Sequence, residues 1–295
     1  MKIKLSSEST CDLPKELLEK YDISIIPYSV ILGDEIVEDD ETVPAKIYEF
    51  VEQTKKLPKT SAINEETYKE YFSNLLKDND AVIHITLSSG LSSSNSHAVS
   101  AAESLKNVYV IDSMTGATGG TLLYELAYEE IMRSNLPANK IVEKLNELKK
   151  QVKTAFYVPN IDGYVRSGRD KTTSNLKNTV LSATSKLAKM GFFKFRVDLN
   201  DNGELFLRKV FRSSTSQGML KMVMDIVNEK NIDKFDRKIV AIGNLYKEKV
   251  NLEVIKDYLR SFNYFDNIVE NGIGSVIAAY GCNDLCGIAL MKKLH

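Results

Sequence analysis

Residues 81–87 read AVIHITL, and this apolar run constrains the fold most strongly because it predicts a buried β-strand. The run leads into a serine-rich segment, SSGLSSSNS, then a helical stretch, HAVSAAESL, and then a further strand at 108–112, VYVID. Strand-like runs and helical periodicity alternate in this way through the first half of the chain. Such alternation is typical of an α/β protein with parallel strands.

The second half of the chain has a different pattern. Residues 190–211 indicate a β-hairpin with its turn at or near Asn202-Gly203, and three short strands are expected at the C-terminal end. We therefore expect two domains: an N-terminal α/β domain, residues 1–152, with a mostly parallel sheet flanked by helices, and a C-terminal α+β domain, residues 153–295, with a mixed or antiparallel sheet. Near the start of the chain, Asp12 is expected to cap a helix.

Composition excludes several classes of protein. Lys and Arg total 39 against 40 for Asp and Glu, and a net charge of −1 argues against nucleic-acid binding. No apolar run approaches the ~20 residues that span a bilayer, and the N-terminal segment lacks the apolar stretch of a signal peptide. Three cysteines suit a reducing compartment, and the three histidines have no metal-ligand spacing. We expect a cytoplasmic protein with no stable membrane anchoring and no bound metal.

Hydroxylated side chains precede two of the predicted helices. Six of the nine residues in 88–96 are serines, and this segment is expected at the carboxyl edge of a parallel sheet, where ligands of open α/β sheets bind. Serine hydroxyls and the free N–H groups of the next helix suit a small anion, especially a carboxylate. The alternative is a cluster that only caps its own helix. Thr60-Ser61 offers the same two interpretations, as a second wall of one cleft or as a simple cap.

A hydrolase is the main catalytic alternative to consider. Ser92, His97 and Asp112 supply the atom types of a catalytic triad, but the chain has no GxSxG motif. Ser92 and His97 also stand five residues apart near a helix start, which does not bring the imidazole onto the hydroxyl. The paired carboxylates Asp39-Asp40 lie in a polar, loop-like run and are expected to be solvated. These observations argue against a serine hydrolase and give only a weak glycosidase signal.

Several short motifs occur in an order that resembles the DegV family of bacterial fatty-acid-binding proteins. The resemblance extends over nearly the whole chain, and its specificity comes from the joint order of the motifs. The opening SESTCDLP at 7–14, KTS at 59–61, SSGLS at 88–92, VIDS at 110–113 and SGR at 167–169 carry it.

The resemblance implies roles for individual residues. Thr60 and Ser92 match the family's carboxylate-binding hydroxyls, and Ser61 and Ser93 are their neighbours. A glycine-rich motif of the family matches Ser167-Gly168-Arg169, and Arg169 is a candidate ligand-binding residue. Tyr280 stands at the place of a family histidine and is also a candidate ligand-binding residue. Arg212 matches an arginine that would face a kinase partner. The chain departs from the family pattern at Glu8, where aspartate is usual, and at Ala62-Ile63, where glutamine-proline is usual. A phenol at 280 donates a hydrogen bond but brings no positive charge.

The function implied is that of a carrier and not of an enzyme. The protein would hold a long-chain fatty acid between its domains, with no other cofactor, and would present the carboxylate to the catalytic subunit of a fatty acid kinase for phospholipid synthesis. An aromatic run at Phe192, Phe193 and Phe195 is a candidate lining for the acyl tail, and we expect a monomer. Two alternatives stay open: an enzyme acting on a small carboxylate or phosphate ester at the same cleft, and a divergent carrier of another apolar ligand.

Overall fold

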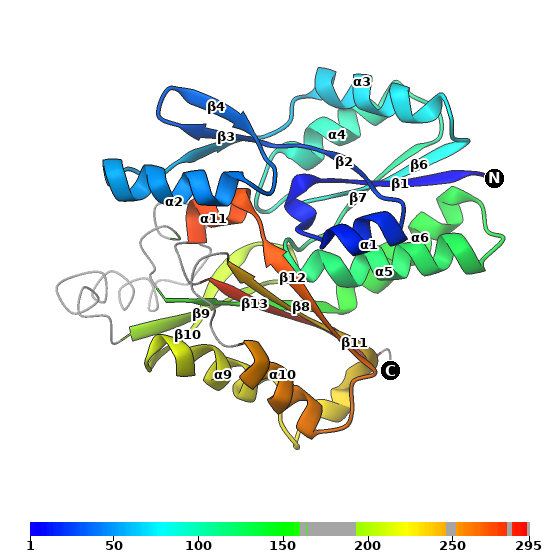
Figure 1. Cartoon of the computed structure of the whole chain (residues 1–295). Helices are drawn as coiled ribbons and strands as arrows, with labels where there is room; N and C mark the ends of the chain where they lie inside the picture. The colour runs from blue at the N-terminus through cyan, green and yellow to red at the C-terminus, as the bar shows by residue number, and fades with distance from the viewer. Residues whose placement is uncertain (160–163, 165–192, 246–251, 282–284, 294–295) are drawn as a thin grey trace.

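The N-terminal half is built on a four-stranded parallel sheet, sheet A, with the order β2-β1-β6-β7 (Figure 1). Every residue of the central strand β6 is buried, as the apolar sequence of this strand predicts. The strands span Ile3–Glu8 (β1), Ser24–Ile26 (β2), Ala81–Thr86 (β6) and Val108–Asp112 (β7). The structure is a computed structural model, and it describes residues 1–159, 164, 193–245, 252–281 and 285–293.

Helices cover both faces of sheet A. Helices α3 and α4 pack on one face, and α5 and α6 pack on the other, on which side Figure 1 also shows α1. The side chain of Asn64 caps α3 by accepting a hydrogen bond from the backbone N–H of Thr67 at 2.9 Å. The helices span Lys15–Lys20 (α1), Glu65–Leu76 (α3), Ser94–Glu103 (α4), Thr118–Arg133 (α5) and Ala138–Leu148 (α6), and a 3₁₀ turn, η2, follows at Lys149–Gln151.

The C-terminal half is built on a six-stranded mixed sheet, sheet C, with the order β10-β9-β8-β13-β11-β12. Only the β11–β12 pair is parallel, and the other four pairs are antiparallel. Helices α9 and α10 cover one face, and α5 packs on the other, so α5 lies between sheets A and C (Figure 1). The elements span Val152–Val158 (β8), Phe193–Leu199 (β9), Leu205–Arg212 (β10), Thr215–Ile226 (α9), Ile232–Lys234 (η4), Phe235–Leu245 (β11), Leu252–Ser261 (α10), Asn267–Ile273 (β12) and Cys286–Lys292 (β13).

A third, smaller sheet lies to one side of sheet A. Sheet B has the order β4-β3-β5, is antiparallel throughout and carries helix α2. Helix α11, from the C-terminal half, packs against α2 and β5, so the two halves of the chain meet here (Figure 1). The elements span Ser9–Cys11 (η1, a 3₁₀ turn), Ser29–Leu32 (β3), Glu35–Glu38 (β4), Val43–Thr54 (α2), Lys59–Ser61 (β5) and Ser275–Gly281 (α11).

The predicted fold class is confirmed: a parallel sheet with helices on both faces precedes a mixed sheet. The predicted hairpin is also present as β9–β10, with Gly203 in its turn at a φ of 70°. Strands of sheets A and B all precede residue 152, and those of sheet C all follow residue 151. The boundary between 1–152 and 153–295 stays a prediction, since α5 and α11 each pack against the other half.

Two local predictions are wrong. Asp12 does not cap a helix: it follows η1 in the left-handed conformation, at a φ of 52°, and Pro14 stands at the N-cap of α1. The C-terminal region holds two strands with helix α11 between them, not three strands. Both errors come from one tertiary contact. Asp12 accepts a hydrogen bond from the backbone N–H of Gly274, at the N-terminus of α11, so its carboxylate supports that helix and not α1.

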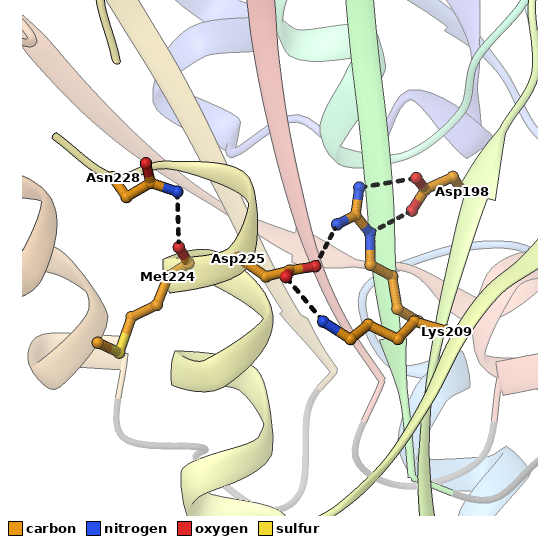
Figure 2. A network of polar contacts seen from close by, with 6 residues as sticks. Asp198, Lys209, Met224, Asp225 and Asn228 are labelled. Atoms are coloured by element: carbon orange, nitrogen blue, oxygen red, sulfur yellow. Dashed lines mark hydrogen bonds and ion pairs between the residues drawn. The ribbon is translucent and has the colours of Figure 1, made fainter. Parts of the chain in front are cut away.

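Helix α9 is tied to the β9–β10 hairpin by a small ionic network. The carboxylate of Asp225 accepts hydrogen bonds from Lys209 Nζ at 2.7 Å and from Arg196 Nη1 at 3.0 Å, and Figure 2 shows Asp225 reaching from α9 toward the strands. Arg196 also donates to both carboxylate oxygens of Asp198. These pairs are partly exposed, so they fix the position of the helix more than they stabilise the fold.

Candidate functional site

A cavity of about 350 Å³ lies between sheet C and the turns at the edge of sheet A. This volume falls within the range of small-molecule sites in proteins, roughly 300–1,000 Å³. Its walls are mainly apolar, and all polar side chains among its described lining residues are neutral hydroxyls. The apolar lining comprises Leu87, Leu91, Phe156, Val158, Val197, Leu205, Val276, Ile277 and Leu285, with Ala62 and Gly116, and the hydroxyls belong to Tyr28, Thr60, Ser92, Ser93, Tyr164 and Tyr280.

The first hydroxyl pair joins Tyr28 and Ser92. We call residues 87–93, which connect β6 to α4, the serine turn. Ser92 Oγ lies 3.0 Å from the Tyr28 hydroxyl and accepts a hydrogen bond from the backbone N–H of Ser94 at 3.1 Å. Tyr28 is only 2% exposed, so its phenol is held in place by the surrounding core. The pair therefore presents two oriented hydroxyls to the cavity.

The second hydroxyl pair joins Thr60 and Tyr280. Thr60 stands in β5 opposite Val30 of β3, and its Oγ1 lies 2.8 Å from the hydroxyl of Tyr280 on α11. These residues are 220 positions apart in the sequence, so the two halves of the chain together form this side of the cavity. Both pairs of hydroxyls can donate and accept hydrogen bonds, which suits the head group of an amphiphile with an apolar body.

Two carboxylates at the N-terminus of α11 support this arrangement. Asp12 accepts a hydrogen bond from the backbone N–H of Gly274, and Asp39 accepts one from that of Ser275. Burial raises the pKa of both carboxyl groups, and the two side chains are close enough for Asp39 to raise that of Asp12 further. They hold the helix that carries Tyr280, but neither lines the cavity. Asp39 was expected to be solvated, and its partial burial contradicts that expectation.

The remaining predicted residues lie in different places. Ser93 is exposed and lines the cavity, whereas Ser61 is exposed and does not line it. Arg212 ends β10 at the opposite end of the strand from the lining residue Leu205, with its guanidinium 5.2 Å from the ring centroid of Phe193. Arg169 lies outside the described residues.

The described part of the aromatic run does not line this cavity, contrary to the lining role predicted for it. Phe193 and Phe195 belong to the core cluster beside the cavity but are absent from its lining, and Phe192 lies outside the described residues. The apolar wall comes instead from neighbouring positions on the same face of sheet C, such as Val197. Phe193 and Phe195 pack in the core cluster, where large aromatic side chains bury much apolar surface.

The atoms of a possible serine hydrolase are not brought together. The Nδ1 atom of His97 lies 2.7 Å from the backbone oxygen of Ile63, and Asp112 accepts hydrogen bonds from the backbone N–H groups of Ser89 and Met114. Ser92 is hydrogen-bonded to Tyr28 instead of to an imidazole. The described arrangement thus lacks the nucleophile–base contact that such catalysis needs.

The described ranges contain neither a membrane-spanning helix nor a metal-binding cluster. No helix there combines the length and the apolar character needed to cross a membrane. In the same part of the chain, no three His, Cys, Asp or Glu side chains cluster in a way that could hold a metal ion.

Sequence reasoning missed Tyr28, which lines the cavity together with Ser92. Tyr28 stands in an extended segment, SIIPYSVIL, where an aromatic residue is ordinary. Its hydroxyl meets Ser92 because the connection between β2 and β3 passes beside the serine turn, and no local pattern in the sequence signals that approach.

A family model described as an uncharacterised protein of the DegV family matches residues 2–293. Among curated proteins, a fatty acid-binding protein of Thermotoga maritima is 28% identical over 288 residues, which cover 95% of this chain and 94% of that protein.

Solved structures show the same fold. A stearic acid-binding protein from Eubacterium ventriosum is 26% identical to this chain, with a TM-score of 0.81, covering 99% of this chain and 98% of that one. The Bacillus subtilis protein DegV, described as a fatty acid binding protein, has a TM-score of 0.80 at 22% identity, and the match covers 99% of this chain and 100% of that one.

Proposed function

The chain belongs to the DegV family, and on this premise we propose that it binds a long-chain fatty acid between its two halves and presents the carboxylate to a partner kinase. The observation that carries the proposal is one cavity with apolar walls and two hydroxyl pairs, Tyr28–Ser92 and Thr60–Tyr280. The relatives from T. maritima and E. ventriosum, which are described as binding fatty acids, support it.

The energetics divide the work between the tail and the head group of the ligand. Burying a 16-carbon tail stabilises the complex by about 10 kcal/mol before the costs of association. Each hydrogen bond to the charged carboxylate contributes about 1.5–3 kcal/mol, and desolvation of the carboxylate offsets most of this. The tail therefore supplies the affinity, and the hydroxyls of Thr60, Ser92 and Tyr280 orient the carboxylate. Ser93, at the exposed rim of the cavity, would contact the same end of the ligand.

The direct test is the ligand itself. Solvent extraction of the purified protein followed by mass spectrometry is expected to recover about one fatty acid per chain, and delipidated protein is expected to bind one when it is supplied. Recovery of no fatty acid together with no binding would exclude the proposal. The length and saturation of the extracted chain would also separate a fatty acid carrier from a carrier of another apolar ligand.

Ser92→Ala is expected to weaken fatty-acid binding about tenfold to hundredfold, because it removes a hydrogen bond to a charged group. Ser96→Ala is the matched control, since Ser96 is an exposed serine of α4 that bonds the backbone of Ser93 and does not line the cavity. Isothermal titration with palmitate would measure both variants. Equal affinities for the two variants would contradict the role given to Ser92.

On this proposal the protein is a carrier, and the chemistry belongs to its partner. The carboxylate would lie at the hydroxyl-lined end of the cavity, near the exposed Ser93, where a kinase could reach it. Arg212 would contact the kinase, and Arg169 would contact the ligand. Acyl-phosphate formation from ATP is then expected only when the loaded carrier and a fatty acid kinase catalytic subunit are mixed. Turnover of a carboxylate or phosphate ester by the chain alone, lost in Ser92→Ala, would favour the enzyme alternative.

A further inference from the structure

A buried carboxylate lies directly behind the serine turn and takes no part in lining the cavity. Glu8 ends β1 and is 0% exposed, yet it has no cationic partner among the hydrogen-bonded groups of the described structure. Its carboxylate accepts hydrogen bonds from the backbone N–H of Leu87 at 2.7 Å, from Thr10 Oγ1 at 3.1 Å and from the hydroxyl of Tyr68. Burial raises the pKa of Glu8, and the hydrogen bonds oppose that rise.

These contacts reach both ends of the serine turn. Leu87, at the entry, is held by Glu8 itself. At the exit, the Tyr68 hydroxyl lies 2.6 Å from Ser94 Oγ. Tyr68 gives its only hydroxyl proton to the carboxylate, and the hydroxyl of Ser94 therefore has two acceptors within reach, the Tyr68 oxygen and the Glu8 carboxylate. The backbone N–H of Ser94 then donates to Ser92 Oγ, which completes a path from Glu8 to the cavity.

We propose that Glu8 and Tyr68 are positioning residues that hold the serine turn, and through it Ser92, in the geometry that receives the ligand's head group. The inference rests on the proposed function. A carboxylate buried without a cation is a poor device for stability, because an apolar side chain in its place would avoid desolvation of the charge. A carboxylate can instead accept hydrogen bonds from several donors at once, and these bonds fix the backbone of the serine turn.

Tyr68→Phe is the sharpest test because it removes one hydroxyl and keeps the ring, which stacks on Phe72 at 5.5 Å between centroids. Glu8 would keep its hydrogen bond from the backbone N–H of Leu87, but Ser94 would lose its contact with the Tyr68 hydroxyl and keep only its contact with Glu8. Fatty-acid affinity is expected to fall about threefold to tenfold. Thr10→Val is the control, since Thr10 also donates to Glu8 but belongs to η1 and not to the turn, and its affinity is expected to stay within about twofold of wild type.

A double-mutant cycle separates positioning from a general loss of structure. If Tyr68 acts through Ser92, then Tyr68→Phe is expected to have no further effect on palmitate affinity in the Ser92→Ala background. Additive losses, or a Tyr68→Phe variant that binds as wild type, would overturn the inference while leaving the proposed function intact. Absence of fatty-acid binding by the wild-type chain, or no effect of Ser92→Ala, would overturn both.

Glu8 can be tested in the same way. In Glu8→Met the side chain keeps its length but loses both carboxylate oxygens, so the Leu87 N–H and the Tyr68 hydroxyl both lose the acceptor that residue 8 provides. The variant is expected to bind palmitate at least as weakly as Tyr68→Phe does. Circular dichroism would establish that Glu8→Met is folded before titration. Wild-type affinity in the folded variant would contradict the role of Glu8, and if the variant does not fold, the cycle with Tyr68→Phe decides.

Discussion

His84 shows how strongly a single buried side chain of this protein responds to its surroundings. It stands in the central strand of sheet A, is 0% exposed and lies 5.0 to 6.2 Å, between ring centroids, from Tyr68, Tyr71 and Phe72. Its Nδ1 atom lies 2.8 Å from Ser6 Oγ. Burial lowers the pKa of the imidazole from 6.5 to about 3, so His84 is neutral in the folded protein at any pH near neutrality.

The lowered pKa of His84 predicts a loss of stability in mild acid. The unfolded chain takes up a proton on this imidazole below pH 6.5, whereas the folded chain does so only near pH 3. The stability contributed by the neutral ring is therefore complete above pH 6.5 and is lost progressively between pH 6.5 and 3, at about 1.4 kcal/mol per pH unit. Urea unfolding of wild type and His84→Gln at pH 7.5 and 5.5 would measure this, since other groups cancel in the difference.

His97→Gln is the control for this measurement. His97 is only half-buried, so this variant controls for the removal of an imidazole as such. If His84→Gln kept the full wild-type loss of stability between pH 7.5 and 5.5, the effect would belong to other groups.

The residues of the candidate site differ in how far the sequence reveals them. Thr60 and Ser92 could be selected because each belongs to a hydroxylated segment shortly before a predicted helix, a pattern with a local physical meaning. Tyr28 and Glu8 could not, because their roles depend on contacts with residues 64 and 60 positions away, respectively. The sequence predicts that hydroxyl groups line the site, but it does not predict which residues those hydroxyls contact.

At the scale of elements, the β9–β10 hairpin connects the two halves of the chain at the candidate site. Its turn packs on the serine turn: Ser88 Oγ donates to the carbonyl oxygen of Gly203 at 2.8 Å. A Cβ atom at Gly203 would lie 2.1 Å from Ser88 Oγ and 2.8 Å from the Cα atom of Met114, and the residue's φ is 70°. The hairpin therefore needs glycine at this position for both its conformation and its close approach.

Gly203→Ala is accordingly expected to destabilise the protein by about 2 kcal/mol or more, from the left-handed conformation and the contact with Ser88 together. Gly272→Ala is the matched control: Gly272 lies in β12, has an ordinary φ, and a Cβ atom there would have nothing within 4 Å. Its stability is expected to be unchanged or slightly higher. Urea denaturation of both variants would measure the difference, and equal stabilities would refute the packing argument.

Elements were predictable where local pattern and tertiary packing agree. The amphipathic pattern from Asn139 onward and the apolar run of β6 each lead to the observed element. Helix α11 was missed because its sequence, SVIAAYG, is rich in β-formers and short, and because carboxylates from a distant segment bind its N-terminal N–H groups. Its helical state depends on the packing of the two halves, which no window of the sequence contains.

At the scale of the whole molecule, helix α5 makes the two sheets interdependent. It contacts β1 of sheet A on one side and β8, β11 and β13 of sheet C on the other (Figure 1). Its residues from Thr118 to Tyr124 are all buried, so each sheet would expose an apolar face if the other unfolded. The cavity adds to this coupling, since its lining comes from both halves of the chain.

Because both sheets share α5 and the cavity, we expect them to unfold together and to be stabilised together by ligand. Native-state hydrogen exchange, read by mass spectrometry, is expected to give similar opening free energies for β6 of sheet A and β13 of sheet C. Fatty acid at a hundred times its dissociation constant is expected to slow exchange in both strands about a hundredfold, or about 2.7 kcal/mol. Two outcomes would show that the halves are independent units: slower exchange in sheet C alone when ligand is bound, or separate opening of sheet A at a lower free energy. Either outcome would contradict the proposal that Thr60, Ser92 and Tyr280 hold the ligand jointly.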